Sequence, residues 1–396
     1  MRLLVLSSSW PLWHGDGRGG FVREWCRVLA HRGIDLVVAV PRPLGEKPPI
    51  DPADPFQVAW LPRVLPAQSS AFHGSGLESN LARHPAALLG LPSFLTAFAA
   101  EAAAMSFMCD GVVAHWLLPM GAVGAAVSRL SGRPLLVVAH SGPPVAARFL
   151  PLSLAVRAVT ASAVSVACVS KTVEAEVRAV GGPDARLVTI PLGVDLRPAT
   201  GHSSAKAPIK RVLFVGRLVA MKGVDVLLRA LAGQPDTRLT VVGDGPEGPV
   251  LRSLASDLGV SATFKGELAH EEARSEMSVA DVLVVPSRAG RLGRVEGMPR
   301  VITEAWSCGL PVVATSAGGA GDVVREHGGG LLAIPGGTRD LRRAIRAVLD
   351  DSDLRQRLSR EAMSAAAKLS WEVVGDRWEA WVRRDGPSVA GARRNG

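Results

Sequence analysis

Tyrosine is absent from this chain of 396 residues, and aromatic residues make up only 5% of it. Single-stranded nucleic acids favour basic surfaces on which aromatic side chains stack against the bases. No basic stretch of this sequence is interleaved with such aromatic residues. The formal net charge of +9 also fits acidic lipid headgroups or phosphate-bearing substrates. We therefore expect no nucleic acid among the partners.

Cysteine is scarce as well. The four cysteines, Cys26, Cys109, Cys168 and Cys308, lie far apart and show no paired spacing. Such spacing fits neither a zinc site nor a disulfide framework. The sequence therefore predicts reduced cysteines in the core.

Long hydrophobic runs are also missing. The longest uncharged apolar stretch, residues 85–100, is interrupted by Pro92 and is shorter than a membrane span. The amino-terminal apolar strand meets three serines and a glycine-rich loop, unlike a cleaved secretory signal. We expect a cytoplasmic protein, either free or peripheral at the inner face of the membrane, where the apolar stretch could rest.

The length and the patterning of the chain predict two domains. A chain of this size exceeds one compact core, and 47% hydrophobic with 20% charged residues is typical of a globular protein. Apolar strand-like runs alternate with alanine-rich helical runs, and the alternation restarts after a segment rich in Pro, Ser, Ala and Gly. This predicts an α/β fold of two Rossmann-like, doubly wound domains. The expected parts are residues 1–195, a linker at 196–208, residues 209–370 and a tail at 371–396.

The expected elements place the loops of interest. In the first domain we expect strands at 3–6, 36–40, 111–114, 135–139 and 188–191, and helices at 20–31 and 121–131. In the second we expect strands at 212–215, 239–242, 282–285 and 312–314, and helices at 224–231, 250–258 and about 299–308. Ligands of such sheets bind beyond the carboxyl ends of the strands. In the tail, Trp371, Trp378 and Trp381 recur at helical spacing and form an apolar stripe that must be buried.

The first candidate site is the turn after strand 212–215, which begins at Gly216. Arg217 and Lys222 bracket this turn before a helix, where a phosphate would meet a positive helix end and two cations. By spacing alone, two solvated cations flanking a turn are an equal alternative. The second candidate is the pair Glu296 and Glu304, before and inside the helix at 299–308. Carboxylates are the usual partners of vicinal hydroxyls, although an exposed glutamate and a helix cap would show the same spacing.

Two further candidates lie in the first domain. Gly19 and Gly20 precede the helix at 20–31, and glycines after a first strand allow a ligand close to the backbone. The spacing of these glycines is not the dinucleotide fingerprint. His115 and His140 each follow an apolar strand, and His140, beside Ser141 and Gly142, is the preferred candidate. A lone histidine is more often structural.

Taken together, these segments resemble family 4 of the retaining GT-B glycosyltransferases over most of the chain. The matching segments are Gly19-Gly20 with Phe21 and Glu24, Ile190–Asp195, Val215–Leu218 with Lys222-Gly223, Val242–Pro246, and Glu296–Glu304 continuing as Ala305 and Cys308–Ala314. Each segment is weak alone, but the order and spacing make the set specific.

The resemblance implies a fold and a set of roles. Two Rossmann-like domains face a central cleft, and the tail helix crosses back to the first domain. The diphosphate of a nucleotide sugar is bound by Arg217, Lys222, the Gly19-Gly20 backbone and amides near Gly216 and Val301. Glu304 binds the ribose, Glu296 and Gly297 bind the transferred sugar, and His140 approaches that sugar. The resemblance further implies a retaining hexosyl transfer without metal or other cofactor, and no Asp-any-Asp motif follows a strand here. After His140 the sequence departs from the family pattern, with Ser141, Gly142, Pro143 and Pro144 in place of Gly and a later Asp.

The partners implied are a nucleotide-sugar donor, UDP- or GDP-linked, and a glycan, glycolipid or small-molecule acceptor. We expect a role in cell-envelope polysaccharide or glycolipid synthesis, with peripheral membrane association. Glycosylation of a soluble secondary metabolite stays open, as do a GT-B nucleotide-sugar epimerase, a phosphorylase and a non-catalytic nucleotide-sugar-binding protein.

Overall fold

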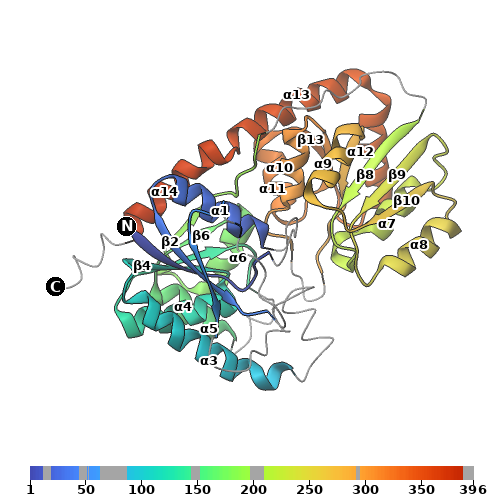
Figure 1. Ribbon diagram of the computed structural model, residues 1–396. Helices are drawn as coiled ribbons and strands as arrows, with labels where there is room; N and C mark the ends of the chain where they lie inside the picture. The colour runs from blue at the N-terminus through green and yellow to red at the C-terminus, as the bar shows by residue number, and fades with distance from the viewer. Residues whose placement is uncertain are drawn as a thin grey trace. The chain divides into compact units, whose positions relative to one another are not determined.

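The computed structural model of this protein describes residues 1–11, 19–43, 51, 53–62, 87–143, 152–196, 209–290 and 295–386. The chain divides into two compact units (Figure 1). The first comprises Met1–Val169, Val173–Ile190 and Gly375–Gly396, and the second comprises Ser170–Thr172 and Pro191–Val374. The expected linker at 196–208 lies outside the described residues except for Leu196.

The first unit is built on a seven-stranded parallel sheet with the order β3-β2-β1-β4-β5-β6-β7. Its strands are β1 (Arg2–Leu6), β2 (Asp35–Pro41), β3 (Gln57–Leu61), β4 (Gly111–His115), β5 (Leu135–Ala139), β6 (Ala163–Cys168) and β7 (Leu187–Thr189). The central strands β4 and β5 are buried throughout, because helices cover both faces of the sheet. The strand order reverses between β1 and β4, and doubly wound sheets bind ligands at this switch point.

Helices complete the first unit. They are α1 (Gly20–His31), α3 (Ala87–Ser106), α4 (Ala122–Ser131), α5 (Leu152–Ser162), α6 (Lys171–Gly181) and most of α14 (Trp371–Asp385), with a π-helical turn at Leu117–Gly121. In Figure 1, α3, α4 and α5 lie on one side of the sheet and α1 and α14 on the other. Trp378 of α14 is fully buried and packs edge-on against Trp25 of α1, and Trp381 donates to the hydroxyl of Ser165 at 3.0 Å. Trp378 and Trp381 of the tryptophan stripe therefore contribute to the core of the first unit, whereas Trp371 belongs to the second.

The second unit contains a six-stranded parallel sheet with the order β10-β9-β8-β11-β12-β13. Its strands are β8 (Lys210–Val215), β9 (Thr237–Val242), β10 (Ala262–Gly266), β11 (Val282–Val285), β12 (Val312–Thr315) and β13 (Gly330–Ala333). Its helices are α7 (Val224–Leu231), α8 (Gly248–Asp257), α9 (His270–Val279), α10 (Arg300–Ser307), α11 (Gly318–His327), α12 (Thr338–Asp350) and α13 (Ser352–Lys368). Phe214 of β8 packs with Leu227 of α7 and Ile345 of α12 in one core. The switch point lies between β8 and β11.

The prediction of two doubly wound parallel sheets is confirmed. The strand predicted at 188–191 is shorter and lies at Leu187–Thr189, and Pro299 precedes α10 instead of occupying its first turn. A short 3₁₀ helix, Ala220–Lys222, intervenes between Arg217 and α7. All four cysteines are buried and free, as predicted.

Helix α3 changes the interpretation of the apolar stretch at 85–100. The helix runs through Pro92 and Glu101 to Ser106, so it continues past the end of the apolar stretch. Within the described residues, Leu89–Ser106 is the one helical stretch long and apolar enough to cross a membrane by length and composition. Phe94, Phe98 and Ala102 are nevertheless buried, and α3 contacts α4, β1 and β3. One side of α3 thus belongs to the core of the first unit.

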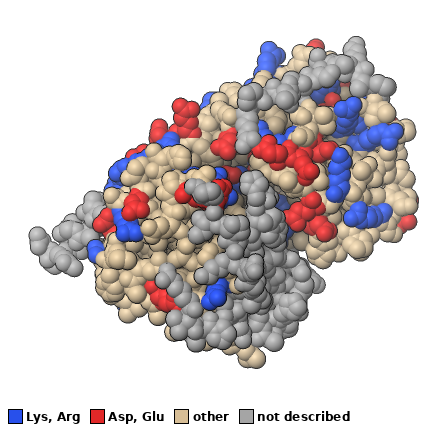
Figure 2. Space-filling model, in the orientation of Figure 1, with Lys and Arg blue, Asp and Glu red and all other residues tan. Residues whose placement is uncertain are grey.

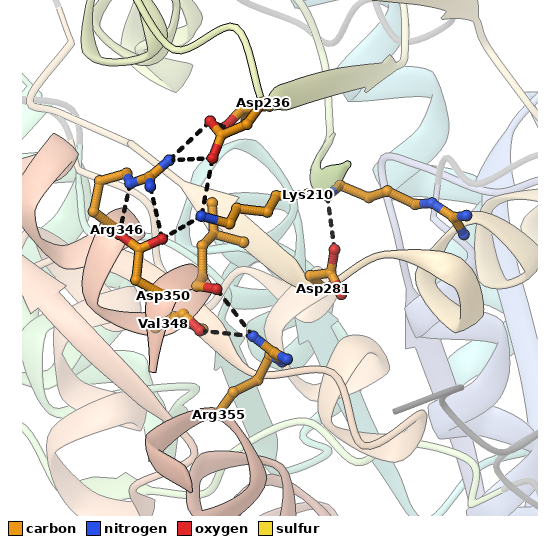
Figure 3. A network of polar contacts seen from close by, with 10 residues as sticks. Lys210, Asp236, Asp281, Arg346, Val348, Asp350 and Arg355 are labelled. Carbon is orange, nitrogen blue, oxygen red and sulfur yellow. Dashed lines mark hydrogen bonds and ion pairs between the residues drawn. The ribbon is translucent and has the colours of Figure 1, made fainter. Parts of the chain in front are cut away.

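A charged network ties together the edge of the second sheet where β8 and β9 begin (Figure 3). Lys210 pairs with Asp236 at 2.9 Å and also with Asp350, while Arg346 contacts both of these carboxylates at 2.7–3.1 Å. The network joins the start of β8, the residue before β9 and the end of α12. Ligands of such sheets bind at the opposite, carboxyl edge, and here the cations pair with carboxylates of the second unit.

Candidate active site

The carboxyl edge of the second sheet gathers most of the predicted donor-site residues. Gly216 and Arg217 follow β8, and Pro286 and Ser287 follow the neighbouring strand β11. The two loops touch at Gly223, whose φ is 68° and where a Cβ atom would lie 2.1 Å from the carbonyl oxygen of Pro286. A side chain there would push the loops apart, so glycine is required.

Lys222 and Glu296 meet directly at this edge. The Lys222 ammonium pairs with Oε1 of Glu296, and the hydroxyl of Ser287 donates to Oε2 at 2.9 Å. Both charged side chains are largely buried, with exposed fractions of 16% and 18%. The backbone amide of Gly319, in the first turn of α11, donates to the carbonyl oxygen of Glu296 at 2.9 Å. Glu296 is therefore held by its backbone and by both carboxylate oxygens.

Ser287 is a site residue that the sequence analysis missed. Its side chain is 2% exposed, and Thr315, which is fully buried at the end of β12, donates its hydroxyl to the Ser287 carbonyl. The signal in the sequence was that Ser287 comes two residues after the predicted strand 282–285, at the edge where ligands bind. Only the structure shows that this strand lies beside β8 at the switch point. Arg288 fixes the same loop by donating to the carbonyl of Ala220 at 3.0 Å.

Arg217, Val301 and Glu304, the residues that the sequence assigns to phosphate and ribose, lie after β8 and in the first two turns of α10. Arg217 is exposed, and its neighbours are fixed because the Gly216 and Leu218 amides donate to the carbonyls of Val242 and Asp244. Val301 lies in the first turn of α10, where backbone amides have no helical partner. Glu304, one turn later, pairs with Arg300 at 3.2 Å. A ligand hydroxyl at Glu304 would meet a carboxylate already oriented by this pair.

In the first unit, Gly19 immediately precedes α1 and lies against the loop that follows β1. Its φ is 69°, and a Cβ atom there would lie 2.6 Å from the backbone of Ser9. The loop residues Gly15, Asp16, Gly17 and Arg18 lie outside the described residues. Phe21, next to Gly20, packs on the ring of His140 at a centroid distance of 4.7 Å. The start of α1 and His140 are therefore neighbours, as the prediction of one site requires.

His140 also contacts the second candidate histidine. Nδ1 of His115 lies 2.8 Å from Nε2 of His140, and both rings are buried. Burial lowers the pKa of His115 to about 3, and burial together with His115 lowers the pKa of His140 well below its usual value. Both imidazoles are neutral near pH 7, so His140 can exchange hydrogen bonds with a substrate but carries no charge to it.

Comparison with known proteins identifies the family. Residues 16–197 match the family described as Glycosyltransferase Family 4, and residues 203–365 match Glycosyl transferases group 1. A GDP-mannose-dependent monoacylated α-(1-6)-phosphatidylinositol monomannoside mannosyltransferase of Corynebacterium glutamicum is 28% identical over 82% of this chain and 89% of its own. A GDP-mannose-dependent α-(1-6)-phosphatidylinositol monomannoside mannosyltransferase of Mycolicibacterium smegmatis is 30% identical over 69% of this chain and 75% of its own.

A solved structure extends the likeness to the fold. Sucrose-phosphate synthase from Thermosynechococcus elongatus aligns over 97% of this chain and 98% of its own, with a TM-score of 0.80 and 23% identity. The two doubly wound units and the loops at their switch points define a glycosyltransferase of the GT-B class. The chain belongs to glycosyltransferase family 4.

Proposed function

We propose that this enzyme transfers a hexose from a GDP- or UDP-linked donor to a glycolipid or glycan acceptor with retention of anomeric configuration and without a metal ion. The observation that supports the donor site is the ion pair of Lys222 with Glu296 at the switch point of the second sheet, where Arg217 lies in the same loop as Lys222. Two cations and a carboxylate at one loop cluster match the two ends of a sugar diphosphate, an anion and a set of hydroxyls.

Each residue of the second unit takes one part of the donor. Arg217 and Lys222 bind the diphosphate, assisted by the amides of Gly216 and Val301. Glu296, held by Ser287 and followed by Gly297, accepts hydrogen bonds from the transferred sugar, and Glu304 accepts them from the ribose. In the first unit, we assign the backbone of Gly19 and Gly20 to the diphosphate and His140 to the sugar.

The chemistry follows from where charge develops. As the glycosidic bond to the diphosphate breaks, negative charge grows on the leaving oxygen, and the acceptor hydroxyl loses its proton to that same diphosphate on the same face of the sugar. Arg217 and Lys222 stabilise this charge, which is the task a divalent cation performs in other phosphate sites. We infer retention of the anomeric configuration from the membership of the chain in glycosyltransferase family 4.

A glycolipid acceptor is supported by two independent features. The two relatives named above act on phosphatidylinositol mannosides by their names. In addition, large apolar side chains are exposed at the starts of α3 and α5, namely Leu89 (88%) and Leu154 (56%). The tan surface over α4 and α5 in Figure 2 carries few charged side chains. We propose that this face holds the enzyme peripherally on the cytoplasmic side of a membrane.

The deciding experiment measures donor binding and transfer together. Thermal shift with GDP-mannose and with UDP-, ADP- and dTDP-sugars should show one stabilising donor. Incubation of that donor with a phosphatidylinositol-mannoside acceptor in EDTA should yield an α-linked product. Conversion of the donor without acceptor would indicate an epimerase instead, and an absolute requirement for Mg²⁺ or Mn²⁺ would refute metal independence.

A further inference from the structure

His115 and His140 form a buried hydrogen bond that is surrounded by aromatic rings. The two rings are nearly coplanar, at 11°, and their centroids are 5.1 Å apart. The nitrogens that face one another, Nδ1 of His115 and Nε2 of His140, are separated by 2.8 Å. The rest of the centroid distance equals about the distance from each ring centre to its own nitrogen, so both nitrogens lie close to the line that joins the two centroids. The bond is therefore linear and in the plane of both rings, which is the strongest arrangement for two imidazoles.

The surroundings fix both ring planes. Trp25 packs edge-on against His115 at 4.9 Å, while Phe21 and Trp116 flank His140 at 4.7 and 5.0 Å. Trp116 has a φ of 71° and is the one described residue other than glycine with a positive φ. A bulky residue adopts this conformation only where its surroundings impose it, and such residues concentrate at functional sites. Here the backbone at Trp116 places an indole against His140.

The outer nitrogens decide which ring donates. His115 Nε2 and His140 Nδ1 are buried and have no hydrogen-bond partner among the described residues. Each neutral ring carries a single N–H group. If His140 donated to His115, the unsatisfied N–H would be at Nε2 of the fully buried His115, which a substrate cannot reach. If His115 donates, the unsatisfied N–H is at the buried Nδ1 of His140, a residue that is 9% exposed as a whole and follows β5 at the carboxyl edge.

We propose that His115 is a positioning residue that donates its Nδ1–H to Nε2 of His140 and so fixes His140 as the Nδ1–H tautomer. This inference rests on the proposed function, in which His140 contacts the transferred sugar. The consequence is that His140 presents one defined donor, which a sugar oxygen accepts. Leaving a buried N–H without an acceptor is costly, so a bound sugar oxygen gains from satisfying it.

Two substitutions of His115 separate positioning from packing. His115→Asn keeps an amide N–H near the position of Nδ1, whereas His115→Leu fills the aromatic cage without a donor. We expect the Leu variant to lose at least about tenfold in kcat, as when a histidine loses its orienting partner. The Asn variant should stay within about threefold of wild type, less than 1 kcal/mol. The dissociation constant for GDP or UDP should be unchanged in both. If His115 only packs, the order reverses, and a Leu variant as active as the Asn variant or more so would overturn the proposal.

Nitrogen NMR of histidine-labelled protein tests the same point without activity. In the wild type we expect the His140 resonances to report a protonated Nδ1 and a bare Nε2, with the assignment made from His115→Asn and His140→Asn spectra. A protonated Nε2 on His140 would overturn the proposal even if every variant were inactive. The expected tautomer in a protein without transferase activity for any donor would contradict the proposed function and leave the His115 assignment standing.

Discussion

The Lys222 ammonium pairs with the Glu296 carboxylate, although the two residues are 74 positions apart. The pair links the loop after β8 to the loop before α10, and Ser287 holds the other carboxylate oxygen. A diphosphate bound by Lys222 must therefore share the ammonium with Glu296. In the proposed reaction, Lys222 contacts both the leaving group and the residue that orients the sugar, so its removal should affect both.

Replacing either cation tests the role in the transition state. Lys222→Ala and Arg217→Ala should each raise the activation free energy by about 2.7–4 kcal/mol, as when one donor to a developing negative charge is lost. This corresponds to a loss of turnover of about 100- to 1000-fold. Lys368→Ala, at the end of α13, removes an exposed lysine of the same unit and should leave turnover unchanged. Steady-state kinetics with saturating donor measure the effect. If both variants stayed within about threefold of wild type, less than 1 kcal/mol, the donor site would be wrongly assigned.

The two glutamates should have different kinetic signatures. Glu304→Ala should raise the donor KM at least about tenfold with a smaller effect on kcat, because ribose contacts exist before and during the reaction and a hydrogen bond to a charged group contributes about 1.5–3 kcal/mol. Glu296→Gln should mainly lower kcat. Arg300→Ala is the matched control for Glu304, since it removes the ion pair but keeps the carboxylate. A rise in KM as large in Arg300→Ala as in Glu304→Ala would show that the pair, and not the ribose contact, matters.

Much of the fold was predictable because apolar strands and helices alternate in the sequence. Helix α1 and strand β5 were predicted with their observed bounds, since polar or glycine-rich loops flank both. Helix α3 was not predicted, because it is apolar on most sides and Pro92 interrupts it, so no helical period stands out. The exposed edge strand β10 was missed because polar residues interrupt its apolar pattern.

The site was predictable only in part. Lys222 and Glu296 were singled out by residue type and motif, but their direct pairing depends on the packing of Gly223 on Pro286 and on the strand order, which no local pattern contains. Ser287 was missed for the same reason. His115 was considered beside His140, yet the bond between them arises only because β4 and β5 are neighbours in the sheet.

The apolar face of the first unit predicts binding to membranes. The protein should cosediment with vesicles of phosphatidylcholine and phosphatidylglycerol, because exposed leucines insert at the interface and the net charge of +9 favours anionic lipid. The double variant Leu89→Asp, Leu154→Asp should lose this binding but keep turnover on a water-soluble acceptor. Val250→Asp, at an apolar residue of α8 whose exposure (64%) lies between those of Leu89 and Leu154, should bind as wild type does. Equal binding by all three proteins would contradict the assignment of this face.

The charged network of Figure 3 should make the free energy of unfolding depend on pH in the acid range. The Lys210 ammonium, with Arg346, lowers the pKa of Asp236 to about 2. A carboxylate with a lowered folded pKa stabilises the protein above its unfolded pKa of about 3.9, and this contribution is lost as the pH falls towards 2. Because Asp236 is 37% exposed, we expect a contribution below about 1 kcal/mol. Urea unfolding of wild type and Asp236→Asn should therefore differ most at pH 6, differ less at pH 3 and converge towards pH 2. A difference that did not shrink on acidification would contradict the pairing.

The carboxyl-terminal helix should stabilise the first unit specifically. Trp378 is fully buried between Trp25 and Trp381, with ring centroids 5.9 and 5.5 Å away. Trp378→Ala should destabilise this unit by about 3–5 kcal/mol, the usual cost of removing a large buried aromatic side chain, and Trp378→Phe should cost less because it keeps most of the packing. Calorimetry can follow the two units as separate transitions. We expect the transition of the first unit to move to lower temperature and that of the second to stay. Deletion of residues 375–396, the carboxyl-terminal part that belongs to the first unit, should remove the first transition and all transfer activity while the second unit still folds. A soluble truncated protein with normal turnover would show that α14 is dispensable for the first unit.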